Sequence, residues 1–334
     1  MERRTAILRG KREGAFDRDQ YYLERAARAR IARKARTQLR RMEPLALVTP
    51  RWSQARRFLD DVAVDLLIGQ PQVRARTLSL HPLEGRTPHQ AWSWLVLAVT
   101  EFCSIPLDGP AWQVVSRRGF RHVMAELFVQ ADRGERRCLM IHGLEQIHVE
   151  ALRDLIELFS DHVRTRTVEP RFNILLAGSI DAPHFEFAGF ERLVLPDFSE
   201  YEALETLVEH LGADDVARLR SVVSMVGGIP ATLDHLGTDA ADRLSDVLAD
   251  RGAVWRVLGA IAAEIRRAYD IVASDEQLLN RIEDLARNGP QLPTPADEAL
   301  LRAGLVRRIG ASDKSRRTAL RAPFLMDLTL EDRA

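Results

Sequence analysis

Residues 137–146 read Arg-Cys-Leu-Met-Ile-His-Gly-Leu-Glu-Gln, an apolar run that ends at a polar residue followed by glycine. A helical pattern over 149–164 follows, so this stretch predicts a buried strand that leads through a loop into a helix. Similar short apolar runs occur at four other places: 45–48, 73–80, 172–177 and 193–195. Near-continuous apolar runs separated by helical patterns favour a parallel sheet covered on both faces, and therefore an α/β fold.

The sequence changes character after Pro196. Five helical patterns follow without a strand, up to about residue 270. The last sixty residues then contain two helical patterns and two short apolar runs, at 305–309 and 318–322, around a polar and basic turn. This order of helix, helix and two-stranded hairpin is typical of a winged helix.

The charges of the chain are unevenly distributed. Its 334 residues contain 48 Lys and Arg and 48 Asp and Glu, but residues 1–57 carry 17 basic and 6 acidic side chains, which leaves 31 and 42 for the rest. The first segment therefore requires an acidic partner, or the acidic remainder of its own chain. No apolar run approaches the roughly 18 residues of a membrane span, which predicts a soluble, cytoplasmic protein without membrane contact.

Cysteine and histidine spacing gives no indication of a metal site. Cys103 and Cys138 both lie in apolar surroundings, and no Cys or His occurs at ligand spacing. We expect two buried free thiols and no metal.

Residues 20–41 form the strongest helical pattern, and it is basic. Its charges lie on all sides, and apolar Leu23, Ile31 and Leu39 are too sparse to bury it deeply. Three partners fit such a helix: the acidic body of the same chain, the phosphate backbone of a nucleic acid, or an acidic protein. The candidate nucleic-acid contacts in this helix are Arg25, Arg28, Arg30, Arg33, Lys34, Arg36, Arg40 and Arg41.

Three local motifs resemble those of AAA+ and STAND-type ATPases, including NACHT-like and origin-recognition-like members. Residues 139–146 (LMIHGLEQ) resemble the Walker B strand, residues 173–179 (NILLAGS) the next strand with Ser179 at the sensor 1 position, and residues 225–230 (MVGGIP) a helix start in the lid. The resemblance covers about residues 44–330. It implies an arm at 1–43, an ATPase-like α/β domain at 44–196, a helical lid at 197–270 and a winged helix at 271–334.

The chain departs from this family where nucleotide would bind. A phosphate loop needs glycines, a lysine and a hydroxyl in the pattern G-x-x-x-x-G-K-[ST], so that N–H groups and charge surround the phosphates. At that place residues 49–57 read TPRWSQARR, with neither Gly nor Lys. Trp52 adds bulk and Pro50 removes a donor. A nucleotide could then be held only through Arg51, Arg56 and Arg57.

The metal-binding and catalytic positions depart as well. His142 replaces the Asp that would organise Mg²⁺, and Gln146 replaces the Glu that would activate water, while Glu145 keeps one carboxylate. Together these replacements remove the charged groups and the base on which phosphoryl transfer depends. We therefore predict a degenerate site without catalytic residues, in which His142, Glu145, Gln146 and Ser179 mark the former Walker B and sensor positions.

A second basic group surrounds the expected wing. It comprises Arg307, Arg308, Lys314, Arg316 and Arg317, at the place where winged helices contact the DNA backbone. In STAND-like proteins this domain also serves as a packing and autoinhibitory element, so both interpretations stay open.

These observations predict a non-hydrolysing AAA+/STAND-like scaffold or adaptor. It would assemble with nucleic acid, with active ATPase subunits, or with both, and it would use no cofactor. The alternatives are an active ATPase switch with an atypical ATP or ADP site, and a regulator that binds only proteins. The chain is accordingly expected to be a pseudo-ATPase and a member of a homo- or hetero-oligomer.

Overall fold

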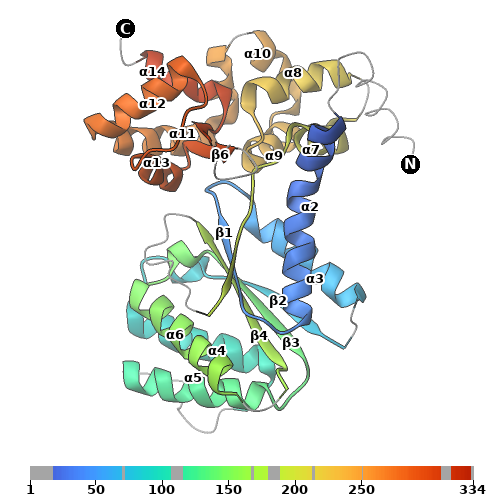
Figure 1. Ribbon diagram of the computed structural model, residues 1–334, viewed down its shortest axis with the longest axis vertical. Coiled ribbons are helices and arrows are strands. Elements are labelled where there is room, and N and C mark those ends of the chain that lie inside the picture. The colour runs from blue at the N-terminus through green and yellow to red at the C-terminus, as the bar shows by residue number, and fades with distance from the viewer. Residues whose placement is uncertain are drawn as a thin grey trace. The chain divides into compact units, whose positions relative to one another are not determined.

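The computed structural model divides the chain into two compact units. It describes residues 18–69, 72–106, 116–166, 169–179, 189–212, 215–249, 251–309 and 317–331. One unit, here called the helical unit, comprises residues 1–29, 50–53 and 196–334. The other, the sheet unit, comprises residues 30–49 and 54–195. Figure 1 shows the elements of both units.

The sheet unit is built on five strands in the order β2-β3-β4-β1-β5. All neighbouring strands are parallel. The strands are β1 (Leu45–Thr49), β2 (Arg74–Ser79), β3 (Arg137–His142), β4 (Phe172–Ser179) and β5 (Glu191–Val194). Each of the five apolar runs in the sequence therefore forms a strand, and the predicted α/β fold with a parallel sheet is confirmed.

Helices cover both faces of this sheet (Figure 1). Leu45 and Leu47 of β1 pack with α3 (Ala55–Gly69) and the second half of α2 (Arg18–Arg40), whereas Ala46 faces the opposite core. The opposite core is covered by α4 (Pro88–Cys103), α5 (Arg117–Ala131) and α6 (Val149–Thr165). All five residues of β1 are buried because neighbours lie on both faces and both edges.

The basic helix α2 is less exposed than the sequence predicts. Over residues 30–40 it packs on the sheet unit through Ala35 and Leu39, which are 0% and 1% exposed, with Ile31 and Ala32 beside them. The prediction that apolar residues are too sparse to bury this helix is wrong for this half. Alanines supply much of the contact, and their small side chains let the helix approach the sheet closely.

The helical unit begins with five α-helices after the sheet. They are α7 (Glu200–Leu211), α8 (Val216–Val226), α9 (Pro230–Thr238), α10 (Leu244–Ala249) and α11 (Arg251–Ala273). Ser199 and Glu202 form a capping box at the start of α7, and Asp215 caps α8. Gly228, in the MVGGIP motif, lies so close to the Phe198 carbonyl that a Cβ would collide with it, which explains glycine at this position.

The C-terminal part follows the element order on which the winged-helix prediction was based. It contains α12 (Glu276–Asn288), α13 (Asp297–Ala303), the antiparallel hairpin β6 (Val306–Ile309) and β7 (Arg317–Leu320), and α14 (Met326–Glu331). These elements share one hydrophobic core with α7–α11. The residues expected as a lid and a winged helix thus fold as one packed body.

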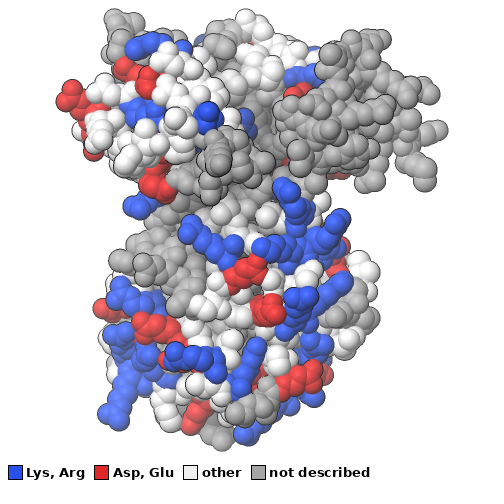
Figure 2. All heavy atoms as spheres, viewed as in Figure 1, with Lys and Arg blue, Asp and Glu red and all other residues white. Residues whose placement is uncertain are grey.

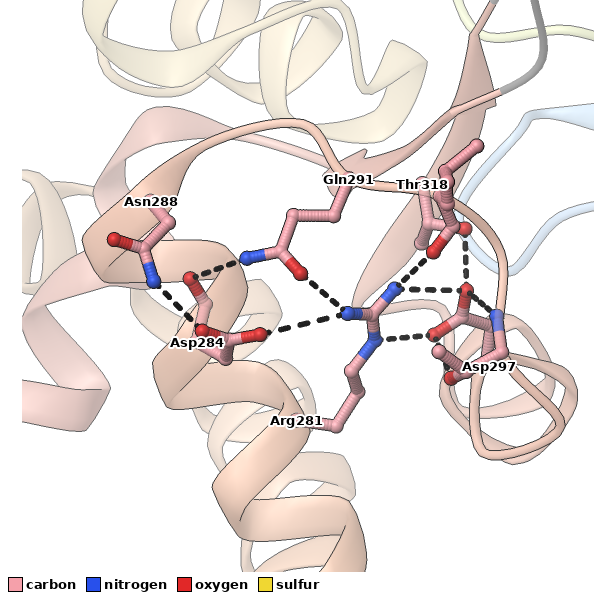
Figure 3. Close-up of polar contacts among 8 residues, drawn as sticks. Arg281, Asp284, Asn288, Gln291, Asp297 and Thr318 are labelled. Atoms are coloured by element: carbon pink, nitrogen blue, oxygen red, sulfur yellow. Dashed lines mark hydrogen bonds and ion pairs between the residues drawn. The ribbon is translucent and has the colours of Figure 1, made fainter.

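A buried ion pair connects helices α12 and α13 with the hairpin (Figure 3). Arg281 donates to both carboxylate oxygens of Asp297, at 2.8 and 3.2 Å, and Asp297 also accepts from the hydroxyls of Thr318 and Thr294. Asp297 is fully buried. Burial alone would raise the pKa of Asp297, but these hydrogen bonds outweigh burial and lower it to about 2.

We predict that Asp297→Asn lowers the free energy of unfolding by about 3 kcal/mol, because buried Arg281 then keeps only the partly exposed Asp284, at 3.6 Å, as a countercharge. A carboxylate with a depressed folded pKa stabilises fully above its unfolded pKa and loses that contribution as the pH falls. Wild-type stability should therefore decline from about pH 4 toward pH 2 more steeply than that of the variant. Urea titrations at each pH measure this.

Asp284→Asn serves as the matched control, since Asp284 lies 3.6 Å from Arg281 with its side chain 44% exposed. The control should lose less than about 1 kcal/mol. Equal losses in the two variants would contradict a special role for the buried pair.

Candidate functional site

The carboxyl ends of β1, β3 and β4 lie next to one another in the sheet unit. Thr49 is paired with Ser179, and His142 with Ala177. Helix α3, which follows β1, covers one face of the sheet, and α6, which follows β3, covers the other. In open parallel sheets ligands bind at the carboxyl edge where the connections change sides, so this edge is the candidate site.

His142 ends β3 at this edge and is half-buried. Burial lowers the pKa of His142, and the positive charge of Arg56 lowers it further, against the opposing effect of Asp60. The imidazole is therefore neutral near pH 7. A neutral imidazole gives Mg²⁺ none of the negative charge that a carboxylate would provide.

Glu145 lies on a short 3₁₀ helix (Leu144–Gln146) directly after β3. One of its carboxylate oxygens accepts a hydrogen bond from the backbone N–H of Ser179, at 3.0 Å. The structure thus brings Glu145 and Ser179 together, as the strand order requires. Gln146 follows as the last residue of the same turn, and its N–H donates to the Gly143 carbonyl.

The three arginines expected to hold a nucleotide belong to two units, Arg51 to the helical unit and Arg56 and Arg57 to the sheet unit. Arg56 lies in the first turn of α3, 3.7 Å from Asp60, with its side chain 74% exposed. Arg57 is exposed. Its charge opposes burial at Asp61, but burial is the larger effect and raises the pKa of Asp61. Arg51 belongs to the helical unit, where its Cβ lies beside Gly304.

Residues 50–53, which stand in the sequence where a phosphate loop would be, are packed into the helical unit. The Trp52 carbonyl accepts the N–H of Ala231 in the first turn of α9, at 3.0 Å. The Trp52 indole donates to Glu264 of α11, at 2.9 Å. A Cβ on Gly304 would lie 2.9 Å from the Trp52 ring, so the ring is pressed against that glycine.

Two residues, one in this segment and one directly after it, have the left-handed backbone conformation. Trp52 has φ 60° and Gln54 has φ 54°. Residues other than glycine rarely adopt such angles, and local strain of this kind persists only where surrounding contacts hold it. For Trp52 those contacts are the hydrogen bonds to Ala231 and Glu264.

These residues do not fit a nucleotide phosphate. Ser53 donates its N–H to the Pro50 carbonyl, Pro50 has no N–H, and the segment has no lysine. Among the residues that the structure describes, no group of His, Cys, Asp and Glu could hold a metal ion. The glycines and the lysine that characterise a phosphate loop are thus absent from this segment.

Sequence reasoning missed Arg321, and it named Arg28 only as a candidate nucleic-acid contact. Arg321, only 1% exposed, donates to both oxygens of Asp197 at 2.6 and 2.8 Å and lies over the Trp52 ring, 5.7 Å from its centre. Arg28 stacks 4.3 Å over the Phe198 ring and donates to the carbonyls of Pro196 and Ser53. Both contacts join residues far apart in the sequence, so no local pattern indicates them.

The basic residues of α2 fall into distinct groups. Arg28 lies in the helical unit, where it donates to the carbonyls of Pro196 and Ser53, and burial lowers its pKa to about 10, so it stays protonated. Lys34 forms an ion pair with Glu191, and Arg36 pairs with Asp65 at 2.8 Å. Arg30, Arg33 and Arg40 are exposed on α2, as Lys34 is, and Arg41 is exposed directly after the helix. The Arg25 side chain lies outside the described residues.

The wing is described only in part. Arg307 is exposed on β6, and Arg317 is half-buried on β7. The side chains of Arg308, Lys314 and Arg316 lie outside the described residues, so nucleic-acid contact at the wing stays a prediction.

Comparison with known proteins reveals similarity in structure only. No protein-family model matches the sequence, and no curated protein matches it. The solved structure of the Walker-type ATPase PABY2304 of Pyrococcus abyssi superposes with a TM-score of 0.60 at 14% identity, over 96% of this chain and 97% of that one. The chain therefore shares the fold of this Walker-type ATPase.

Two further solved structures align with this chain at lower similarity. The ORC2 protein of Aeropyrum pernix, solved in ADPNP–ADP complexes, has a TM-score of 0.46 at 11% identity, over 98% of this chain and 97% of that one. The ORC1 protein of the same organism, solved with DNA, has a TM-score of 0.45 at 14% identity, over 92% of each chain. Within the described residues, no helix is both long and apolar enough to cross a membrane.

We predict that Trp52 stabilises the helical unit through its ring and its indole N–H. Trp52→Phe should lower the free energy of unfolding by about 1 kcal/mol, because one hydrogen bond is lost. Trp52→Ala should lower it by about 3 kcal/mol, because the ring also leaves Gly304 and Arg321. Urea denaturation followed by far-UV circular dichroism measures both values.

Glu264→Ala provides the control through a double-mutant cycle. Alone it should lower stability about as much as Trp52→Phe does, and added to Trp52→Phe it should have little further effect. Additive losses would show that the indole and this carboxylate do not interact.

Proposed function

We propose that this chain is a non-hydrolysing AAA+/STAND-like subunit that serves as a scaffold or adaptor, assembling with nucleic acid, with active ATPase partners, or with both. The observation that carries the proposal is the packing of residues 50–53. The Trp52 carbonyl and indole are both committed to hydrogen bonds within the helical unit. The segment that would bind phosphate in an active relative therefore serves the fold instead.

The remaining chemistry at the carboxyl edge supports the same proposal. Phosphoryl transfer depends on a lysine and Mg²⁺ to neutralise charge, and on a group that orients the attacking nucleophile. His142 is neutral, and an oxygen of Glu145 is held by the Ser179 N–H. The positive charge of Arg56 acts on His142, but Arg56 is exposed and lies beside Asp60.

The surface charges support the part of the proposal that concerns assembly with nucleic acid. Arginines remain exposed along α2 and on β6, although the chain as a whole has no net charge. Exposed cations without a role in the fold are typical of proteins that bind a polyanion. An oligomer with active ATPase subunits would supply the hydrolysis that this chain lacks.

We predict that the purified protein does not turn over ATP above background, with or without Mg²⁺. Wild-type protein and Glu145→Gln should release phosphate at the same rate, because Glu145 has no catalytic role. A coupled phosphate-release assay measures the rate, and calorimetric titration with ATP and ADP should give no saturable heat.

Mg²⁺-dependent turnover that Glu145→Gln abolishes would sink the proposal and favour the atypical ATPase. A further control is Glu157→Gln, which removes an exposed carboxylate of α6 that pairs with Arg121. Activity lost equally in both variants would indicate a contaminating enzyme or a general loss of folding.

A further inference from the structure

We propose that the exposed side of α2 and the amino edge of the sheet form one surface that binds the backbone of duplex nucleic acid. This inference rests on the nucleic-acid part of the proposed function. The surface, here called the arginine stripe, consists of Arg30, Arg33, Arg40, Arg41, Arg136 and Arg171. The sequence predicts an arm at residues 1–43, whereas residues 30–40 of α2 lie on the sheet unit.

The first part of the stripe follows from how α2 packs. Ala35 and Leu39 are buried against the sheet unit, so the opposite side of the helix faces solvent and carries Arg30, Arg33 and Arg40. Ten residues separate Arg30 from Arg40, which is about 15 Å along the helix axis. The burial of one side therefore orders the arginines into a row on the other.

The second part comes from the strand starts beyond the end of α2. The guanidinium of Arg136 donates to the Arg40 carbonyl at 2.9 Å, and that of Arg171 donates to the Gly134 carbonyl at 3.2 Å. Arg137 is paired with Phe172 in the parallel register, so Arg136 and Arg171 are neighbours across β3 and β4. Each bond uses one of five guanidinium N–H donors and leaves others for a ligand.

The stripe has an unbalanced charge. No carboxylate among the described residues lies within 4.0 Å of a nitrogen of its six arginines, whereas nearby Lys34, Arg36 and Arg74 each form an ion pair. Glu135, at the same edge, is already held by Arg74 at 2.9 Å and by Arg137 at 3.4 Å. Figure 2 shows Lys and Arg side chains gathered over the sheet unit on the face in view.

The side chains between these arginines favour phosphate over protein. Protein interfaces depend on buried aromatic or aliphatic anchors, and the exposed large apolar residues of the described chain lie elsewhere, for example at Ile68 and Ile271. Single-stranded nucleic acid needs aromatic platforms, and the stripe itself contains none. A row of guanidinium groups suits the regularly repeated phosphates of a duplex, without sequence preference.

The test measures binding of a fluorescent duplex of 25 base pairs to the full-length protein at several NaCl concentrations. Arg33→Gln with Arg40→Gln should weaken binding roughly 10- to 100-fold at 0.1 M salt and make the log–log salt slope shallower by about 1.8. Arg33→Lys with Arg40→Lys keeps both charges and should keep most of the slope. A second pair on separate elements, Arg41→Gln with Arg171→Gln, should also weaken binding, so the result does not depend on the folding of one variant.

Arg118→Gln with Arg153→Gln is the control, because it removes the same charge from exposed positions on α5 and α6. An equal loss of affinity in this control would overturn the proposal, since affinity for the duplex would then depend only on the net charge of the protein. Absence of duplex binding, or displacement of the duplex by polyglutamate as readily as by unlabelled duplex, would overturn it as well. None of these results depends on ATP turnover, so failure of the stripe and failure of the pseudo-ATPase proposal are distinguishable.

Discussion

The parallel pairing of β1 between β4 and β5 is the constraint on which the rest of the structure depends. This pairing buries every residue of β1 and fixes which side chains enter each of the two cores of the sheet unit. It also aligns Thr49 with Ser179 at the carboxyl edge. The chain passes to the helical unit directly after β1, at Pro50, and again after β5, at Pro196. The position of one strand therefore sets the candidate site and two of the places where the chain changes units.

At the carboxyl edge and in the segment after β1, polar groups serve the fold. The Trp52 carbonyl satisfies an N–H in the first turn of α9, where helices leave donors without an internal partner. The Glu145 carboxylate satisfies the Ser179 N–H, and burial keeps His142 neutral. Arg321 and Asp197 add a buried ion pair next to Trp52. The hydrogen bonds of Trp52 and Glu145 thus satisfy backbone donors of the fold.

Much of the fold could be predicted from the sequence, because five short apolar runs separated by helical patterns leave few alternatives to a parallel sheet. The missing Gly and Lys after β1 could also be recognised. The packing of α2 could not, because alanines such as Ala35 carry little apolar signal but allow close approach. The roles of Trp52, Arg28 and Arg321 could not be predicted either, since their partners lie far away in the sequence and the left-handed φ of Trp52 leaves no local pattern.

The engagement of Trp52 has an evolutionary consequence. Replacing Trp52 by glycine would remove the hydrogen bond to the Glu264 carboxylate and leave a gap beside Gly304. A lysine introduced nearby would still lack a loop to position it. No single substitution on the way to a phosphate loop would bring a gain before the others are present. Such dependence between positions makes the present state of the segment hard to reverse by stepwise mutation, so descendants of this chain should keep the segment even where other surfaces diverge.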